Sequence, residues 1–260
     1  MNILQKIIKQ KKPKIEQLKT TIPVSVLEKS DFFVRSCLSM RSALQKQSAS
    51  GIIAEFKRKS PSKGFINQFA QADEVTKGYA QAGASGVSVL TDTEFFAGNN
   101  KDLSAVRKYL NIPVLRKDFI FDEYQIIEAK SIGADVILLI AEVLTKTQIR
   151  QFVRLAHSLG LEVLMELHDI DQLPKISDEI DMIGINNRNL KTFEVSIQHS
   201  IQMRNQLPNG FVYVSESGIK SPRDVQMLKK HQFQGFLIGE SFMKTENPPQ
   251  ACQKFIKSLQ

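Results

Sequence analysis

Lysines and glutamates stand directly after short apolar segments at several points in this 260-residue sequence. Glu55 and Lys57 are two residues apart in "AEFKRKS", Lys117 ends "VLRK", and Glu166 and Glu216 follow "EVLM" and "VYVS". Ammonium and carboxylate groups are common proton donors and acceptors in enzymes. If the fold brings these side chains together, the expected chemistry is acid–base catalysis on a small molecule.

Further polar residues follow later apolar segments. Asn186 and Arg188 belong to "GINNRNL", and turns that contain glycine follow in "SESG" and "IGES". Backbone N–H groups in such turns bind phosphate when the turns end neighbouring strands of a barrel. Buried charges are costly without a partner or a ligand, so we expect a phosphorylated substrate at this site. The turn residues are Ser217, Gly218, Gly239, Glu240 and Ser241.

Other reaction classes lack the residues that they need. No cluster of histidines or cysteines has the spacing of a metal site, and neither a G-x-S-x-G segment nor a P-loop occurs. We therefore expect a site that uses no metal and no cofactor. His168 follows an apolar segment and could reach the site, but a single histidine there is more often structural. Phe96 and Phe119 could flank an aromatic substrate, with packing in the core as an equal alternative.

The elements that would position these residues form a repeating pattern from residue 50 onward. Each unit has a short apolar segment, a turn and an amphipathic helical segment. Segments such as "DVILLI", apolar on both faces, are typical of a parallel sheet covered by helices. Eight units in about 210 residues predict an α/β fold, a single eight-stranded parallel βα (TIM) barrel. The predicted strands are Ile52–Phe56, Gly86–Thr91, Val114–Lys117, Val136–Ala141, Glu162–Leu167, Met182–Asn186, Phe211–Ser215 and Gly235–Gly239.

An open, doubly wound sheet is the alternative architecture. The first predicted strand, however, leads into "KRKSPSKG" and not into a glycine-rich dinucleotide-binding turn. In a TIM barrel the active site lies at the carboxyl ends of the strands, which is where the lysines and glutamates stand. The barrel is therefore favoured. We expect residues 50–260 to form it and residues 1–49 to form an N-terminal helical extension packed on it.

Composition is that of an ordinary globular protein. Hydrophobic residues make up 42% of the chain and charged residues 24%, and the apolar segment Val136–Ala141 is too short to cross a membrane. The N-terminus does not resemble a signal peptide, because lysines continue through its apolar positions. Cys37 and Cys252 are the only cysteines and lie far apart, as expected in a reducing compartment. We expect a cytoplasmic protein with no membrane partner.

The net charge of +8 raises the question of a nucleic-acid partner. Residues 1–20 hold six lysines and one acid, Glu16, so six positive charges minus one negative charge leave +5 in this segment. Its apolar residues recur at helical spacing, which favours a helix docked on the rest of the protein with solvated lysines. Pro13 is expected to bend or restart this helix. We expect no nucleic-acid partner; salt-dependent binding that is lost on deletion of residues 1–20 would reveal one.

Six motifs resemble, in order and spacing, those of the indole-3-glycerol-phosphate synthase family, a TIM-barrel family of tryptophan biosynthesis. They extend from about residue 50 to residue 245, and a lysine-rich N-terminal helical segment is also usual in that family. The resemblance implies closure of the indole ring of 1-(2-carboxyphenylamino)-1-deoxyribulose 5-phosphate, with release of carbon dioxide and water. The motifs are "IIAEFKRKSPSKG", "VLRKDFI", "VLMELHD", "IGINNRNLKTF", "SESGI" and "FLIGESFM".

By motif position, the resemblance also implies roles for catalytic residues. Lys117 resembles the general acid that protonates the ketone oxygen during ring closure. Glu166 resembles the acid–base residue of the later dehydration. Lys57 matches a lysine that contacts the substrate's anionic groups and shares in proton transfer. Further members of the catalytic set are matched by Glu55, Asn186, Glu216 and Ser217.

The resemblance implies substrate-binding residues as well. The loop 59–64 is expected to fold over the substrate as a lid; a plain connection is the alternative. Gly218, Gly239 and the amides of Glu240 and Ser241 match the phosphate-binding positions, and Glu240 replaces a serine of some relatives. The other substrate-binding positions are Ser60, Pro61, Phe96, Phe119 and Arg188.

Two other TIM barrels that bind related phosphates are alternatives. Phosphoribosylanthranilate isomerase is disfavoured because that family has a cysteine in its first strand, whereas neither Cys37 nor Cys252 stands at a strand end. The tryptophan synthase α chain is the other alternative. We expect a monomer.

Overall fold

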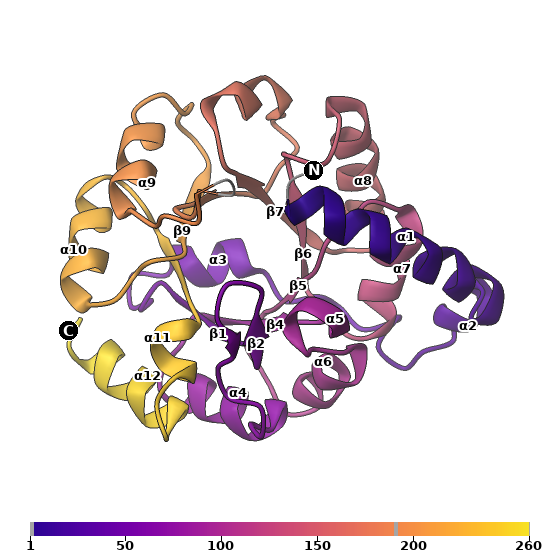
Figure 1. Cartoon of the computed structure of the whole chain (residues 1–260), viewed down its shortest axis with the longest axis horizontal. Helices are drawn as coiled ribbons and strands as arrows, with labels where there is room; N and C mark the ends of the chain where they lie inside the picture. Colours follow the sequence, from indigo (N-terminus) through magenta and orange to yellow (C-terminus); the bar gives the residue numbers. More distant parts are fainter. Residues whose placement is uncertain (1–2, 190–191, 260) are drawn as a thin grey trace.

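The computed structural model describes residues 3–189 and 192–259. Its centre is a closed barrel of eight parallel strands ringed by helices (Figure 1), so the predicted TIM barrel is confirmed. Each barrel strand pairs with the next barrel strand along the chain, and the last one pairs with the first. The barrel strands are β1 (Ile52–Phe56), β4 (Gly86–Leu90), β5 (Val114–Lys117), β6 (Val136–Ile140), β7 (Glu162–Leu167), β8 (Met182–Asn186), β9 (Val212–Glu216) and β10 (Gly235–Ile238).

Helices connect the strands and cover the outside of the barrel (Figure 1). Their starts follow from local sequence, since Thr145 and Ser221 each accept the N–H of the third helical residue in a capping box. The helices are α1 (Ile3–Thr21), α2 (Val24–Leu27), α3 (Met40–Gln45), α4 (Ala72–Gln81), α5 (Thr93–Phe96), α6 (Asn100–Arg107), α7 (Glu123–Ser131), α8 (Lys146–Ser158), the 3₁₀ helix η1 (Ile170–Lys175), α9 (Ile197–Arg204), α10 (Pro222–Lys230), α11 (Glu240–Met243) and α12 (Pro248–Lys257).

Side chains alternate along each strand between the barrel interior and the helix-covered outside. In β1, Ile53 packs inside with Leu115 and Leu138, whereas Ile52 and Phe56 pack outside. The same alternation turns the last inward residue of several strands toward the open end of the barrel. These residues are Glu55 of β1, Lys117 of β5, Glu166 of β7, Asn186 of β8 and Glu216 of β9.

Helices α1 and α3 of the N-terminal segment both pack against the barrel. Leu4 and Ile7 of α1 belong to the same buried cluster as the barrel interior, and so do Met40 and Leu44 of α3. In Figure 1, α1 is the indigo helix that lies across one side of the barrel. None of the helices in the described part of the chain combines the length and hydropathy of a membrane span.

Two expectations for α1 are wrong in part. The helix runs from Ile3 to Thr21 and includes Pro13, so it does not restart there. Buried residues on both sides of the proline, Ile7 and Ile15 among them, hold both halves against the protein and offset the lost backbone hydrogen bond. Lys11 is not solvated, because its side chain is only 13% exposed and pairs with acids of the barrel.

The segment predicted as a loop over 59–64 contains a small hairpin. Strand β2 (Lys59–Ser60) pairs antiparallel with β3 (Gly64–Phe65). Gly64 has φ +68°, a left-handed conformation that favours glycine. Two residues of the motif "IGINNRNLKTF", Leu190 and Lys191, lie outside the described residues.

Candidate active site

A cavity of about 180 Å³ opens at the carboxyl ends of the strands. Of the residues predicted from sequence, Gly218 and Ser241 do not line this cavity. The alternation of side chains along parallel strands explains the convergence of the others, since their strands end at the same rim. The predicted residues that do line it are Glu55, Lys57, Ser60, Pro61, Phe96, Lys117, Phe119, Glu166, Asn186, Arg188, Glu216, Ser217, Gly239 and Glu240.

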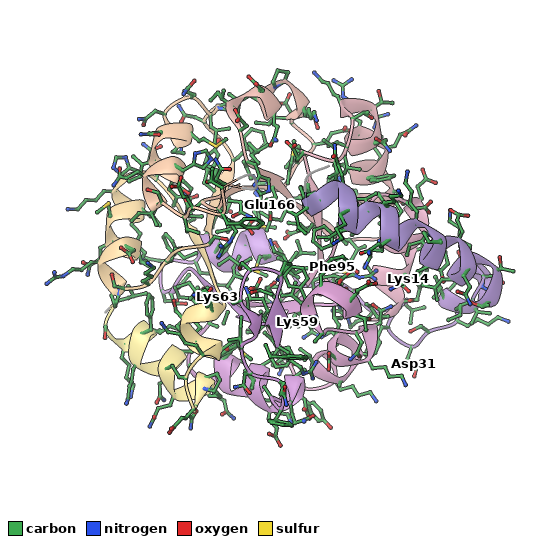
Figure 2. All side chains as sticks on the ribbon, viewed as in Figure 1. Lys14, Asp31, Lys59, Lys63, Phe95 and Glu166 are labelled. Atoms are coloured by element: carbon green, nitrogen blue, oxygen red, sulfur yellow. The ribbon has the colours of Figure 1, made fainter. Side chains whose placement is uncertain are left out.

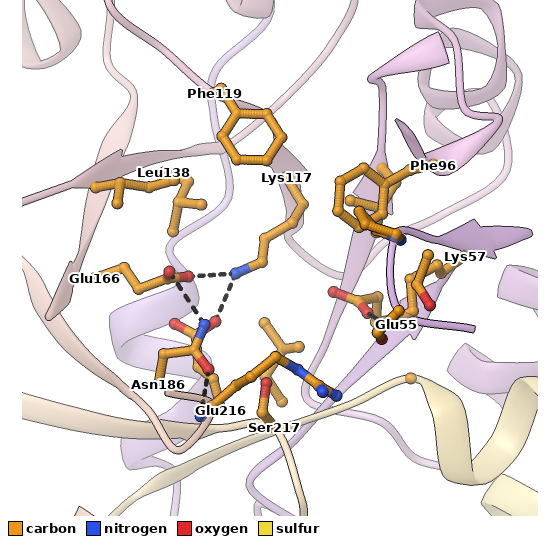
Figure 3. Close-up of a pocket in the computed structure, with 18 of the residues that line it drawn as sticks. Glu55, Lys57, Phe96, Lys117, Phe119, Leu138, Glu166, Asn186, Glu216 and Ser217 are labelled. Atoms are coloured by element: carbon orange, nitrogen blue, oxygen red, sulfur yellow. Dashed lines mark hydrogen bonds and ion pairs between the residues drawn. The ribbon is translucent and has the colours of Figure 1, made fainter. Parts of the chain in front are cut away.

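Lys117 lies between carboxylates from two other strands (Figure 3). Its Nζ is 2.7 Å from Glu166 Oε2 and 2.5 Å from Glu216 Oε2. Asn186 Nδ2 donates to Glu166 Oε1 at 3.1 Å, so the two oxygens of Glu166 have different partners. The Lys117 ammonium is therefore held between two acceptors at the mouth of the barrel.

The charges in this group shift each other's proton affinities. Burial lowers the pKa of Lys117, but the carboxylates of Glu166, Glu216 and Glu55 more than offset burial and raise that pKa. Burial raises the pKa of Glu166, but Lys117 and His168 more than offset it and hold that pKa well below its ordinary value. Lys117 is therefore an ammonium and Glu166 a carboxylate at neutral pH.

Glu216 differs from Glu166 although both contact the same lysine. Burial raises its pKa to about 7, with Lys117 opposing and Glu166 adding to the rise. Its Oε2 contacts Lys117, whereas its Oε1 is buried without a hydrogen-bond partner among the described residues. The site thus contains one carboxyl group that is ionised and one that titrates near neutrality, which is a pattern typical of acid–base sites.

Glu55 and Lys57 form a second pair, on the other side of the cavity from Glu166 (Figure 3). Lys57 Nζ is 2.7 Å from Glu55 Oε1. Gly239 leaves room for this pair, because a Cβ at residue 239 would lie 2.5 Å from Glu55 Oε1. A Cβ at Gly184 would lie 2.3 Å from Glu216 Oε1 in the same way. Glycine at these two positions lets the backbone approach the carboxylates closely.

The ends of β8 and β9 are joined by side-chain hydrogen bonds. Asn187, which is buried, donates from Nδ2 to Ser215 Oγ at 2.9 Å and to Ser217 O at 3.0 Å. Ser217 has φ +68°, an uncommon conformation for serine that this contact helps to hold. Arg188 N–H donates to Asn186 Oδ1 at 3.0 Å. Asn187 thus supports the site from behind, while Asn186 and Arg188 line the cavity.

The predicted phosphate-binding turns follow β9 and β10. Gly218 has φ +75°, which favours glycine, and Gly239 and Glu240 line the cavity. Ser241 Oγ donates to Ile219 O at 2.9 Å, so this hydroxyl is already used within the turn. The part of this region that faces the cavity is therefore formed by Gly239 and Glu240.

One lysine contacts the carboxylate of Glu240, and two further cations act on it electrostatically. Lys63 Nζ is 3.0 Å from Glu240 Oε1. Burial raises the pKa of Glu240, but the hydrogen bond and charge of Lys63, with the charges of Lys57 and Arg188, more than offset burial and lower that pKa. Lys63 lies between β2 and β3, so the hairpin is linked by an ion pair to the rim of the barrel; Figure 2 labels Lys63 and Lys59 there.

An apolar wall faces the charged groups. The rings of Phe96 and Phe119 have their centroids 6.0 Å apart. Both rings line the cavity, together with Leu138 and with Leu4 and Ile7 of α1. The cavity therefore has an apolar side suited to an aromatic ring and a cationic side suited to an anion.

Sequence reasoning missed three features of the site. His168, left as structural, lines the cavity and contacts Glu166 Oε1 through Nε2 at 2.6 Å. Lys63 was not singled out, although it pairs with Glu240. Lys11 of α1 reaches Asp118, the residue after Lys117, at 2.7 Å. The two-residue spacing in "ELH" could have indicated that His168 lies beside Glu166. Lys63 and Lys11 are remote in sequence from the acids that they contact, so no sequence pattern indicates those pairs.

Some buried polar atoms at this cavity have no hydrogen-bond partner. Ser60 Oγ, His168 Nδ1 and Glu216 Oε1 have none among the described residues, and all three residues line it. Such atoms are costly unless a ligand or water reaches them. Across residues 3–189 and 192–259, no group of three or more His, Cys, Asp or Glu side chains is arranged to hold a metal ion.

A closed βα barrel with paired lysines and glutamates at its mouth defines a class, the TIM-barrel enzymes that perform acid–base chemistry at the carboxyl ends of their strands. Comparison with known families is more specific. The family model for indole-3-glycerol phosphate synthase matches residues 4–255. The chain belongs to the indole-3-glycerol phosphate synthase family, and it is a carboxy-lyase of tryptophan biosynthesis.

Curated relatives agree with this assignment. An indole-3-glycerol phosphate synthase of Bacteroides thetaiotaomicron is 48% identical over 259 residues, covering 100% of this chain and 99% of the relative. The enzyme of the same name from Carboxydothermus hydrogenoformans is 39% identical, covering 96% and 98%. That of Bordetella pertussis is 44% identical over 203 residues, covering 78% of each. The resemblance seen in the motifs is therefore confirmed.

Solved structures of distant sequence share the fold. The 3-hexulose-6-phosphate synthase of Salmonella typhimurium aligns with a TM-score of 0.63 at 14% identity, covering 80% of this chain and 98% of that one. A chain of the tryptophan synthase a2b2 complex of Pyrococcus furiosus aligns with a TM-score of 0.57 at 13% identity, covering 81% and 97%. At these identities the likeness shows a common barrel and nothing more specific.

Proposed function

We propose that this enzyme converts 1-(2-carboxyphenylamino)-1-deoxyribulose 5-phosphate into indole-3-glycerol phosphate, carbon dioxide and water in the cavity around Lys117. The observation that carries the proposal is the contact of the Lys117 ammonium with Glu166 and Glu216, at 2.7 and 2.5 Å. This contact places a proton donor beside two carboxyl groups of different proton affinity. The reaction needs a donor first and an acid–base group later, at one place.

Lys117 acts in ring closure. The ring carbon that bears the carboxylate attacks the ketone carbon, a carbon–carbon bond forms, and the ketone oxygen takes a proton from Lys117 Nζ. Because its carboxylate neighbours raise the pKa of Lys117 despite burial, this residue holds its proton at neutral pH and serves as donor. General acid catalysis of this kind contributes about a hundred- to ten-thousand-fold in rate.

Decarboxylation follows from the cationic character of the closed ring. The bond to the carboxylate breaks, carbon dioxide leaves, and the electron pair of that bond restores the aromatic ring. Glu55 stabilises the positive charge of the ring and nitrogen electrostatically in a buried site. Asn186 and Ser217 line the same part of the cavity and orient the hydroxyl groups of the substrate.

Glu166 acts in dehydration. The hydroxyl group formed from the ketone leaves as water, and the neighbouring methylene carbon loses a proton, which completes the indole. A carboxylate whose two oxygens are held by Lys117 and Asn186 is oriented for this proton transfer. Lys57, paired with Glu55 at 2.7 Å, contacts the anionic groups of the substrate and shares in proton transfer.

The phosphate group binds at the turns after β9 and β10. Gly218, Gly239 and the amides of Glu240 and Ser241 form its cradle. The side chain of Glu240 repels an anion there, but Lys63 neutralises that charge at 3.0 Å and Arg188 adds a positive charge from the cavity wall. The hydroxyl of Ser241 is already bound to Ile219 O, so its backbone serves the phosphate.

The aromatic end of the substrate lies against the apolar wall. Phe96 and Phe119 flank the anthranilate ring, and Ser60 and Pro61 of the hairpin region cover it. We propose that the enzyme acts as a monomer. We further propose that it works in the cytoplasm, with residues 1–49 as an extension of a single barrel domain, and that it needs neither metal nor cofactor.

The test is direct. Chelator-treated, dialysed enzyme is mixed with the substrate, and indole formation is followed by fluorescence. Product should form without added metal or nucleotide; a folded enzyme that forms none would overturn the proposal. Inorganic phosphate should also raise the melting temperature, as any ligand selective for the folded state does. Loss of that rise in Gly218→Val would support the cradle.

A further inference from the structure

His168 contacts the carboxylate that we assign to dehydration. Its Nε2 is 2.6 Å from Glu166 Oε1, and the two side chains are 7% and 4% exposed. Asn186 Nδ2 donates to the same oxygen at 3.1 Å, while Lys117 binds the other oxygen. Each oxygen of Glu166 thus has its own donors.

The backbone of His168 is fixed by two other elements. Its N–H donates to Gln172 Oε1 of η1 at 2.8 Å, and its carbonyl accepts from His199 Nε2 of α9 at 3.0 Å. Gln172 is itself held, because its Nε2 donates to Glu142 Oε2 at 2.7 Å. These two backbone hydrogen bonds therefore hold His168 in the position from which its imidazole contacts Glu166.

The two ring nitrogens of His168 have different surroundings. An ionised carboxylate only accepts hydrogen bonds, so the Nε2 that contacts Glu166 carries a hydrogen in both protonation states of the ring. Nδ1 is buried without a hydrogen-bond partner in the described part of the chain. It is therefore the atom that gains or loses the proton when the ring changes charge.

We propose that His168 is a positioning residue for Glu166, which holds the carboxylate ionised and aimed for the dehydration step. This inference rests on the proposed function and adds to it the residue on which the acid–base group depends. The imidazole acts in two separable ways. Its Nε2–H fixes the direction of Oε1, and its positive charge, when present, favours the ionised form of Glu166.

The surrounding charges agree with this role. Burial lowers the pKa of His168, but the hydrogen bond and charge of Glu166, and the charge of Glu216, more than offset burial, so that pKa is raised despite Lys117. From β5, β7 and β9 the charged groups facing the ring are Lys117, Glu166 and Glu216. From η1 and α9 the neighbours are Gln172, which carries no charge, and His199.

Two substitutions separate orientation from charge. His168→Gln keeps an N–H donor without the charge, whereas His168→Phe removes both. We expect His168→Phe to lower kcat by about ten- to a hundredfold with little change in KM, since misplacing a reacting group has an effect of this size. We expect His168→Gln to regain most of that loss at neutral pH. In both variants the decrease of kcat on the acidic side of the pH profile should move to higher pH. The reason is that Glu166 loses a positive neighbour, which raises its pKa.

His157→Gln is the matched control, because His157 also contacts an acid, Asp181 at 2.9 Å, but lies on α8 away from the cavity. Its kinetics should equal those of the wild type. A wild-type pH profile in His168→Gln and a wild-type kcat in His168→Phe, with indole formed normally, would overturn the inference and leave the proposed function intact.

A second measurement needs no activity. In enzyme labelled with ¹⁵N-histidine, the His168 ring should carry hydrogen on Nε2, and its pKa should lie above the ordinary range for histidine. Glu166→Gln should lower that pKa. An ordinary titration that Glu166→Gln does not change would overturn the inference. This result is decisive even if the wild type forms no product, or if His168→Phe does not fold.

Discussion

At the scale of single residues, the site depends on one ammonium group shared by two carboxyl groups. Lys117 Nζ lies 2.7 Å from Glu166 Oε2 and 2.5 Å from Glu216 Oε2. A third carboxylate, Glu55, is paired with the other lysine of the cavity, Lys57. Lys117 is therefore the lysine that contacts Glu166 and Glu216. We therefore propose that the division of acid and base roles follows from which groups share a partner.

Replacement of Lys117 by methionine tests the donor. Lys117→Met should fold, because the side chain keeps much of its length, and should lower turnover by at least about a hundredfold through loss of the proton donor. Turnover and circular dichroism are measured beside Lys230→Met, an exposed lysine of α10. Near-wild-type turnover in Lys117→Met would remove this residue from the acid role.

Glu216 gives a prediction about stability and pH. Burial raises its pKa to about 7 from 4.5, so the folded state prefers the protonated form. Its contribution to the free energy of unfolding is full below about pH 4.5 and is lost as the pH rises through about 7. The melting temperature of Glu216→Gln, relative to wild type, should therefore increase between pH 5 and pH 8. A difference that stays constant over this range would contradict the prediction.

Some of these residues were predictable from the sequence and others were not. Glu166 and Asn186 stand at the ends of apolar segments whose two-residue period turns them inward, so their place follows from the strand pattern. His168 comes just after its strand, where the period no longer applies. Lys63 contacts Glu240, and Lys11 contacts Asp118, only because the folded barrel brings these residues together. Contacts between residues so remote in sequence leave no local pattern.

At the scale of elements, the strands position the polar side chains of the cavity, while the hairpin and α1 line its outer part. The strand predictions agree with the structure to within one residue, because segments buried on both faces are continuous in apolar residues. The β2–β3 hairpin was not predicted, since each strand has two residues and no apolar alternation. Helix α1 does not restart at Pro13, because burial on both sides of the proline overrides local propensity.

The hairpin is predicted to act as a lid. Replacing Pro61 with alanine should change turnover and KM together by altering the closing equilibrium, with little effect on the melting temperature because Pro61 is exposed. Steady-state kinetics and calorimetry check this. Unchanged kinetics, with equal hairpin order in free and product-bound crystals, would make the hairpin a simple connection.

Helix α1 is predicted to depend on Lys11. Its ammonium lies 2.7 Å from Asp118 Oδ1 and 3.0 Å from Asp92 Oδ2, and Lys11→Met leaves these buried carboxylates without it. The free energy of unfolding should fall by about 3 kcal/mol, and KM should rise because Leu4 and Ile7 of α1 line the cavity. Lys12→Met, an exposed neighbour, is the control. Equal stability and KM in both variants would contradict the role of Lys11.

At the scale of the whole molecule, the closed barrel brings strands from across the chain to one rim. The fold and several site residues were predictable together, since several repeating units supply both a strand and a polar residue at its end. The basic N-terminal segment fits this picture as well. Lys11, Lys14 and Lys19 pair with acids outside α1, namely Asp92, Asp118, Glu94 and Asp122, so part of its charge is matched within the protein.

We propose that Lys117 and Glu166 act one after the other in the same cavity. Single turnovers with substrate labelled in its carboxylate measure labelled carbon dioxide and indole fluorescence together. Wild-type enzyme should give the two in equal amounts, and Lys117→Met should give neither at a comparable rate. Glu166→Gln should release carbon dioxide ahead of indole, because dehydration alone is slowed. Carbon dioxide and indole appearing together at the wild-type rate in Glu166→Gln, or rapid carbon dioxide release by Lys117→Met, would contradict the account.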